Sequence, residues 1–240
     1  GRILRLFRRG QNEEATIIAD LKAIGLNVRD LPTQMRVDFG SHVGGSLDAI
    51  IDGGVPEAPS KKHVAEFKTH SKKSFDELEK KGVEKAKFEH FVQMQTYMHG
   101  TKIDRALYLA VCKDDDRIYT ERVEYDEGVA TNAINRGKRI ALSDRMPPPL
   151  STDPTWYQCK FCPAYTFCHK TQTTEHVNCR TCAHSTATEA STWVCERHSG
   201  NEIPTEWQRE GCATGTQMSL HLGLKKFSPT PSFVPIQMPR

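Results

Sequence analysis

Two carboxylates and a lysine have types and a spacing that suit metal-dependent hydrolysis. Asp48 follows the run Gly44–Leu47, and Glu66-Phe67-Lys68 lies in a β-like run. Residues i and i+2 of a strand share a face, so Glu66 and Lys68 are expected to point into a cleft while Phe67 packs inward. The carboxylates and the backbone carbonyl after Glu66 offer the hard oxygen ligands that suit Mg²⁺. A neighbouring lysine can orient or deprotonate a water, so the pattern predicts phosphodiester hydrolysis.

The Glu-x-Lys spacing alone is common, and the sequence repeats it elsewhere. Glu79-Lys80-Lys81 has the same spacing, and Asp20-Leu21-Lys22 is a second acidic copy; both lie on polar faces of predicted helices. On this pattern alone, an ion pair on an exposed edge strand explains Glu66 and Lys68 as well as a catalytic site does.

Three further polar residues could complete such a site. Gln93 and Tyr97 are four apart and therefore share one helix face. Glutamine can hold a phosphate oxygen or a metal-bound water, and tyrosine can stack or donate to a DNA backbone. Glu14, four residues after Gly10, is a third carboxylate that could approach the same metal. The alternative for Gln93 and Tyr97 is the polar edge of an amphipathic helix.

Taken in order, these motifs resemble the PD-(D/E)XK nuclease superfamily, and most of all its RecB-like and lambda-exonuclease-like (YqaJ) phage exonucleases. The resemblance covers roughly Gly1 to Cys212. The motifs that carry it are Gly10-x3-Glu14, Gly45-x2-Asp48, Glu66-x-Lys68 and Gln93-x3-Tyr97, within the longer similar stretches Gly44–Ile50, Glu66–His70, Gln93–Met98 and Asp104–Val111.

The resemblance implies a fold, a set of roles and a function. It implies an α/β, restriction-endonuclease-like core with a mixed sheet flanked by helices. Asp48 and Glu66 would be ligands of Mg²⁺ (or Mn²⁺), Lys68 the catalytic lysine, and Glu14, Gln93 and Tyr97 the remaining active-site residues. Leu47 replaces the Pro of the signature, at a permissive position.

The implied activity is a Mg²⁺-dependent DNA exonuclease in phage recombination or DNA end processing. Its substrate would be double-stranded DNA ends, and its location the cytoplasm of a bacterial host. A single-strand annealing protein and further copies of the chain are candidate partners. The alternatives are a non-catalytic, zinc-containing DNA-binding or scaffold protein with a decayed nuclease core, and a nuclease of the CRISPR adaptation type.

Seven of the eight cysteines fall between Cys159 and Cys212, in two groups. Cys159, Cys162 and Cys168 resemble the iron–sulfur arrangement of AddB-type helicase–nucleases and CRISPR adaptation nucleases, which implies a 4Fe-4S cluster whose fourth cysteine comes from upstream of the core. Alternatively, His169 completes a zinc site, or the cluster is degenerate.

The second group, Cys179-x2-Cys182-x12-Cys195-x16-Cys212, has the ligand number and the Cys-x2-Cys spacing of a ribbon-type zinc site. His198 is an alternative fourth ligand. Four filled positions predict a structural zinc. Disulfides are the alternative, but a reducing cytosol disfavours them.

Alternating helix and strand signals predict an α/β domain that positions the acidic site. Gly1–Arg9 and Glu13–Ile24 are expected to be helical, with Gly25 as the stop. Further helices are expected at Phe75–Lys81, Lys85–His99 and Asp126–Leu142, and strands at Val43–Ile51, His63–His70, Arg105–Cys112 and Arg117–Tyr125, of which the last two form a hairpin.

Composition limits the class of protein and indicates how the chain is divided into regions. The predicted organisation is a nuclease core at 1–142, whose native N-terminus is expected to be missing or processed, a Pro-rich linker at 143–156, a Cys-rich metal-binding region at 157–214, and a disordered tail at 215–240. A hydrophobic fraction of 37% argues against wholesale disorder, and the longest apolar run, Ala106–Cys112, is too short to cross a membrane. A net charge of +3 does not by itself indicate a nucleic-acid binder.

Overall fold

The computed structural model describes residues 1–30, 35–143, 148–171 and 178–211. It divides into two compact units. The first contains Gly1–Phe39 and Gly44–Arg136, and the second contains Gly40–Val43 and the described residues from Gly137 onward.

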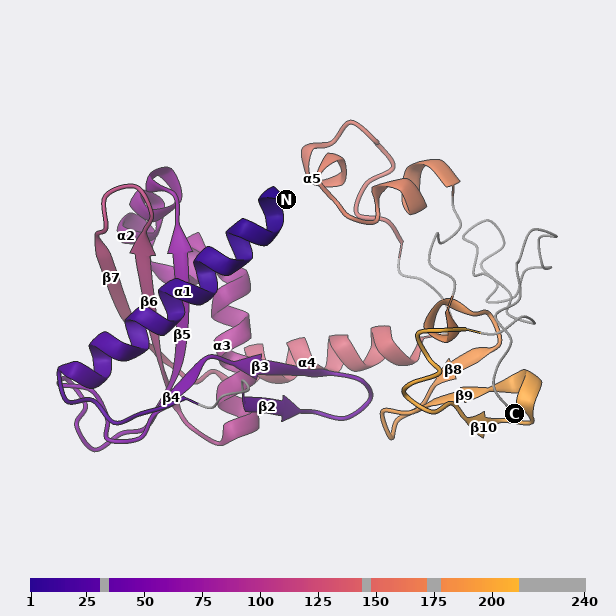
Figure 1. Ribbon diagram of the computed structural model, residues 1–240, viewed down its shortest axis with the longest axis horizontal. Coiled ribbons are helices and arrows are strands. Elements are labelled where there is room, and N and C mark those ends of the chain that lie inside the picture. The colour runs from indigo at the N-terminus through magenta and orange to yellow at the C-terminus, as the bar shows by residue number, and fades with distance from the viewer. Residues whose placement is uncertain (31–34, 144–147, 172–177, 212–240) are drawn as a thin grey trace. The chain divides into compact units, whose positions relative to one another are not determined.

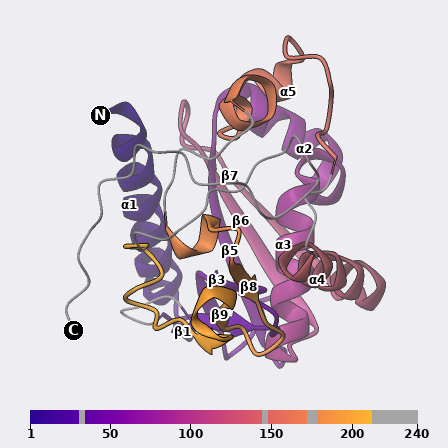
Figure 2. The same ribbon diagram turned by 90° about the vertical axis from the view of Figure 1, so that its right-hand side faces the viewer.

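A mixed five-stranded sheet forms the centre of the first unit (Figure 1). The strand order is β1-β4-β5-β6-β7, and β5 and β6 are parallel whereas the other neighbours are antiparallel. The strands are β1 (Val28–Arg29), β4 (Ala49–Ile51), β5 (His63–His70), β6 (Arg105–Cys112) and β7 (Ile118–Glu124). A separate ribbon pairs β2 (Met35–Asp38) with β3 (Gly44–Leu47). Helices cover both faces of the sheet, so the predicted α/β class with a mixed sheet is confirmed (Figure 2).

Helix α1 (Arg2–Ala23) covers one face of the sheet. It packs through Ile17, Ile18 and Leu21 against a cluster that includes Phe67. Gly25 follows the helix with φ of +93°, a conformation that favours glycine. The predicted helical start and the glycine stop are both confirmed.

Helices α2 (Lys72–Ala86) and α3 (Phe88–Thr101) cover the other face. Together they form the crossover that two parallel strands, β5 and β6, require. The sequence predicts a gap between the helices from residue 82 to 84, but α2 continues through a kink at Gly82, whose φ is +75°. Helix α4 (Glu127–Leu142) follows the β6–β7 hairpin, as predicted.

The prediction of one strand over Val43–Ile51 is wrong. The chain bends at Asp48, so that β3 pairs with β2 while β4 pairs with β1 and β5. Both segments are β-like, and only their non-local partners distinguish them. The short strands β1 and β2 lack a local pattern that would have predicted them.

The second unit is built around a small antiparallel sheet in the order β10-β9-β8. Its elements are α5 (Tyr157–Lys160), the π-helical turn η1 (Phe167–Thr171), the 3-10 turns η2 (Cys179–Thr181) and η3 (Glu196–His198), β8 (Ser185–Ala187), β9 (Trp193–Cys195) and β10 (Asn201–Glu202). Its Gly40–Val43 segment is held by hydrogen bonds to residues 189–192. Part of the predicted linker, Cys212 and the predicted tail lie outside the described residues.

In the part of the chain that the structure describes, no helix is both long and apolar enough to cross a bilayer.

Candidate active site

Strand β5 carries Glu66 and Lys68 on the face that α2 and α3 cover, while Phe67 packs on the α1 side. Glu66 is fully buried, and the Lys68 side chain is 25% exposed. The Lys68 Nζ contacts Glu66 Oε1 and donates to the Phe67 carbonyl at 3.2 Å. The pair is therefore a largely buried ion pair within the central strand of the sheet, and the edge-strand alternative is wrong.

The bend between β3 and β4 brings Asp48 beside this pair. The Phe67 amide donates to Asp48 Oδ2 at 2.9 Å, two residues beyond the last β4–β5 register pair, Ala49 and Ala65. The same oxygen lies 3.9 Å from Lys68 Nζ. The break in the predicted strand is thus what turns the Asp48 side chain toward β5.

A cavity of about 370 Å³ opens at this point. Asp48 and Lys68 line it from the sheet, and Glu14 lines it from α1. The remaining lining residues are Leu6, Phe7, Gly10, Gln11, Glu13, Ile17, Phe67 and Thr69. Glu66 was expected to point into the cleft, but it is fully buried and is not part of this lining.

Burial dominates the electrostatics of the carboxylates. It raises the pKa of Glu66 to about 7; the negative charges of Asp48 and Glu14 add to the rise, and Lys68 opposes it. Burial also raises the pKa of Asp48, against Lys68 and the Phe67 amide. Burial acts to lower the pKa of Lys68, but the two carboxylates raise it above its ordinary value, so Lys68 is cationic.

Helix α3 adds the predicted pair of Gln93 and Tyr97. The Gln93 amide donates to Tyr97 Oη at 3.1 Å. The pKa of Tyr97 is raised by burial and by the charges of Glu66 and Asp48, which places the ring near the carboxylates. A Cβ atom on Gly45 would lie 2.5 Å from Tyr97 Cε1, so only glycine lets the ring sit against β3. All six predicted site residues therefore gather at one place.

The carboxylates fit a divalent cation by their donor chemistry. Glu66 Oε2 is buried, and no hydrogen-bond partner for it exists among the described residues. A buried acceptor of this kind calls for an explanation such as an ion. Mg²⁺ commonly binds one or two protein carboxylates and completes its shell with water and substrate phosphate. Within the described ranges, no three His, Cys, Asp or Glu side chains form a metal site by themselves.

A hydrogen-bonded chain of four side chains on the same face of the sheet was not predicted from the sequence. Tyr108 Oη lies 2.9 Å from both His70 Nε2 and His90 Nδ1, and Ser74 Oγ lies 3.1 Å from His70 Nδ1. Burial lowers the pKa of each histidine to about 4, with Lys68 contributing to both, so both rings are neutral at pH 7. The sequence shows that His90 lies three residues before Gln93 on one helix. It does not show that Tyr108 of β6 pairs with Glu66 of β5, which brings Tyr108 to this face of the sheet.

The first cysteine group begins at α5. The Cys162 amide donates to the Cys159 carbonyl at 3.0 Å. Burial and then the other two thiols raise the pKa of Cys168. The ring of His169 lies against Tyr165 at 5.2 Å between centroids. Iron–sulfur and zinc ligation both stay predictions here.

The second group lies at the small sheet. The Cys182 amide donates to the Cys179 carbonyl at 3.2 Å, which forms the tight turn expected of Cys-x2-Cys. Ser185 also donates to that carbonyl, and Ser185 pairs with Cys195 across β8 and β9. His198 ends η3. Because Cys212 lies outside the described residues, the four-cysteine zinc site stays a prediction.

Comparisons with known proteins identify no family. No protein-family model matches the sequence, and no curated protein matches it. Among solved structures, the crystal structure of SSO0001 aligns with a TM-score of 0.43 and 20% identity, over 66% of this chain and 68% of that chain. A similarity of this size supports no conclusion about activity.

Proposed function

We propose that the first unit is a Mg²⁺-dependent deoxyribonuclease with a restriction-endonuclease-like core, acting as an exonuclease on DNA ends. The observation that carries the proposal is the unpartnered, buried Oε2 of Glu66, on a carboxylate that shares Lys68 with Asp48. Two buried carboxylates share a single lysine here, and a buried charge without a full partner is costly, so the arrangement favours a bound cation over a purely structural ion pair.

Each residue has a role that its position supports. Asp48 and Glu66 would hold Mg²⁺, which when bound polarises the scissile phosphate and lowers the pKa of a water. Lys68, cationic and partly exposed to the cavity, can donate to a phosphate oxygen and orient the water. The Gln93 amide and Tyr97 hydroxyl hold each other in place near the carboxylates. Glu14 adds negative charge from α1.

The first test is the loss of hydrolysis in site variants. We expect Glu66→Ala and Lys68→Ala each to lower the Mg²⁺-dependent degradation of linear duplex DNA by about 100-fold or more, a typical size for an acid–base or nucleophile-positioning group. Lys81→Ala is the matched control, because Lys81 has the same spacing from an acidic residue but pairs with Glu77 on an exposed helix face. Full activity in both site variants would reject the proposal.

Further experiments distinguish exonuclease action from the alternative functions. Degradation of linear but not covalently closed circular duplex would support exonuclease action. Calorimetric titration of Mn²⁺ addresses the decayed core, since a scaffold that has lost its nuclease function should bind no metal at Asp48 and Glu66. A nuclease of the CRISPR adaptation type requires an iron–sulfur cluster at Cys159, Cys162 and Cys168, which iron analysis of anaerobically purified protein would reveal.

A further inference from the structure

Strands β5 and β6 carry a continuous row of polar side chains through the candidate active site. Glu66, Lys68 and His70 alternate along β5 and therefore share the face that α2 and α3 cover. Tyr108 of β6 lies opposite Glu66 in the parallel register, so its buried ring is on the same face. The row thus continues from the two proposed active-site residues of β5 to His70 and Tyr108.

His90 faces the same region from α3. It lies three residues before Gln93 and seven before Tyr97, a spacing that puts the three side chains on one face of the helix. After burial, the charge of Lys68 does most to lower the pKa of His90, so the ring lies near that lysine. His90 Nε2 has no hydrogen-bond partner among the described residues, and it is not one of the fully buried atoms that lack one. This nitrogen is therefore open to solvent beside the candidate site.

Hydrogen bonds connect His90 to the other side of the sheet face. His90 Nδ1 and His70 Nε2 both lie 2.9 Å from Tyr108 Oη, and Ser74 Oγ lies 3.1 Å from His70 Nδ1. Ser74 belongs to the first turn of α2 and is partly exposed. The hydrogen-bonded chain therefore runs from half-buried His90 through buried Tyr108 and His70 to the surface at Ser74.

The chemistry of the four groups allows two arrangements of their protons. Both rings are neutral at pH 7, so each has one N–H and one bare nitrogen, and the single proton of Tyr108 can go to only one of them. In the first arrangement both rings carry their proton on Nδ1, and His70 donates to Ser74. In the second arrangement both carry it on Nε2, and Ser74 donates to His70. His90 Nε2 is a bare acceptor in the first arrangement and a donor in the second.

We propose that His90, Tyr108, His70 and Ser74 form a proton relay that carries a proton from a water in the candidate active site to solvent. This inference rests on the proposed function for the reaction that it serves, because the water that attacks a phosphodiester must lose a proton. Lys68 is cationic and cannot accept that proton. His90 would contact the reacting water, whereas the other three residues act through His90.

Each transfer along the relay is balanced. Starting from the first arrangement, His90 Nε2 takes a proton from the water and leaves hydroxide as the nucleophile, while the Nδ1 proton of His90 moves to Tyr108 Oη. The Tyr108 proton moves to His70 Nε2. The Nδ1 proton of His70 moves to Ser74 Oγ, whose own proton passes to solvent. The result is the second arrangement, in which no side chain has gained a charge, and the reverse transfer resets the relay.

Tyr108→Phe tests the relay, because it removes the hydroxyl that joins the two rings and keeps the aromatic ring in the core. We expect kcat for the Mg²⁺-dependent degradation of linear duplex DNA to fall about tenfold or more, with KM unchanged, since proton transfer affects the transition state and not substrate binding. Tyr125→Phe is the matched control, because Tyr125 Oη lies 2.7 Å from His99 Nδ1 in another tyrosine–histidine pair of α3. An unchanged kcat in Tyr108→Phe overturns the inference.

Chemical rescue tests His90 itself. We expect His90→Ala to lose as much activity as Tyr108→Phe and added imidazole to restore part of kcat, because the position is open to solvent. 1-Methylimidazole should not restore it, because this molecule has a similar shape but no N–H proton to pass on. Rescue by both compounds, or by neither, would contradict a relay through this position.

Nitrogen-15 NMR of the histidine rings separates this inference from the proposed function and needs no substitution that could disturb folding. In the wild-type protein without DNA, we expect His70 and His90 to carry their proton on the same ring nitrogen, in equal proportions. Opposite tautomers overturn the relay even if the protein hydrolyses DNA. Matching tautomers in a protein that hydrolyses no DNA support the proton path and reject only the nuclease proposal.

Discussion

At the scale of single residues, the most informative group is Glu66. Its pKa of about 7 results mainly from burial, with Asp48 and Glu14 as nearby negative charges. A proton and a divalent cation compete for the same carboxylate. Above pH 7 the carboxylate is ionised and able to bind the metal, whereas below pH 7 it is increasingly protonated.

We therefore expect the affinity for Mn²⁺ to fall by up to about tenfold per pH unit as the pH decreases below 7, because one proton must leave for the metal to bind. Titration calorimetry at pH 6, 7 and 8 measures this dependence. The Glu66→Gln variant should bind Mn²⁺ weakly at every pH, with no comparable dependence. An affinity that is constant from pH 6 to 8 in the wild-type protein would show that Glu66 is not a ligand.

The histidines of the buried chain give a second dependence on pH. His70 and His90 have folded-state pKa values of about 4, below the ordinary value of 6.5, chiefly because of burial. As the pH falls below 6.5, these histidines bind protons in the unfolded chain but not in the folded chain, so their contribution to the free energy of unfolding decreases until about pH 4.

Urea denaturation at pH 7.5, 6 and 5 measures that decrease. In the double variant His70→Gln/His90→Gln we expect a flatter profile between pH 7.5 and 5, although the variant is less stable at pH 7.5. Equal slopes in the wild-type protein and the double variant would contradict the neutral, buried state of both rings. The difference between the two slopes is the test, because protonation of Glu66, whose pKa is raised, opposes the decrease in both proteins.

At the scale of elements, two glycines with opposite surroundings lie at the candidate site. Gly45 of β3 is in contact with Tyr97, whereas Gly10 of α1 faces open space. We expect Gly45→Ala to destabilise the protein by about 1–3 kcal/mol, as overpacking does, and to lower activity by displacing Tyr97. Gly10→Ala should stabilise α1 by up to about 1 kcal/mol, because alanine is the better helix former. Chemical denaturation of both variants measures their free energies of unfolding. If both variants are stabilised, or both are destabilised, the prediction is wrong.

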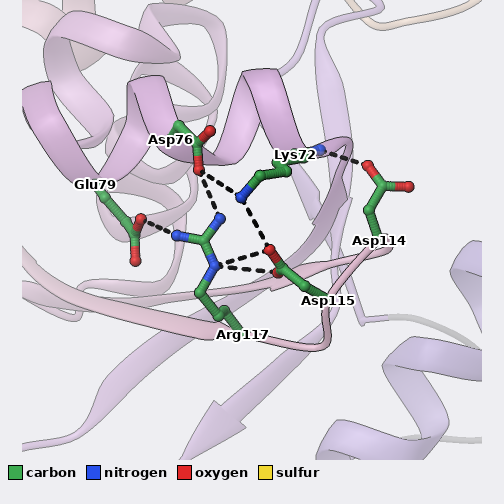
Figure 3. A network of polar contacts seen from close by, with 6 residues as sticks. All are labelled: Lys72, Asp76, Glu79, Asp114, Asp115 and Arg117. Carbon is green, nitrogen blue, oxygen red and sulfur yellow. Dashed lines mark hydrogen bonds and ion pairs between the residues drawn. The ribbon is translucent and has the colours of Figure 1, made fainter.

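A surface network connects α2 to the turn between β6 and β7 (Figure 3). Arg117 contacts Asp76 and Glu79 of α2 and Asp115 of the turn, and its guanidinium lies 4.9 Å from the centroid of the buried Phe75 ring. Asp114 also accepts a hydrogen bond from the first amide of α2. Exposed ion pairs contribute little singly, but this arginine joins several groups across two elements.

We expect Arg117→Ala to lower the free energy of unfolding more than Lys81→Ala, which removes only one pair along a single helix. Hydrogen bonds from Arg117 lower the pKa of Asp76 and Asp115, so their contribution is complete above the ordinary aspartate pKa and is lost as the pH falls below it. Urea denaturation in low and high salt should show the difference shrink with salt. Equal effects of the two variants would contradict the role of the network.

Elements were predictable from sequence where their pattern is local. The bounds of β5 and β6 match their apolar and β-branched runs, and Gly25 marks the end of α1. Where partners lie far apart in sequence, prediction failed: nothing near Asp48 indicates that β3 and β4 belong to different sheets. The types of the site residues were therefore predictable from spacing, but the full burial of Glu66 was not, because it depends on the packing of α2 and α3 against β5.

At the scale of the whole molecule, the two units differ in how they can be stabilised. Both clusters of buried apolar residues belong to the first unit, on the two faces of its sheet. In the second unit, the buried apolar side chains among the described residues are those of Cys159, Ala183 and Ile203. A unit with so little buried apolar surface needs another source of stability, and bound metal is the usual one for small Cys-rich domains.

We therefore expect the second unit to depend on zinc and the first unit not to. Metal analysis should find at least one zinc per chain, and removal of zinc should make the second unit sensitive to protease while the first stays resistant. Cys182→Ser should act like zinc removal. Cys112→Ser should do the opposite and destabilise the first unit alone, because Cys112 is buried in the core of that unit and belongs to neither cysteine group. A zinc-free protein whose second unit still resists protease would show that other interactions, such as disulfides, hold this unit together.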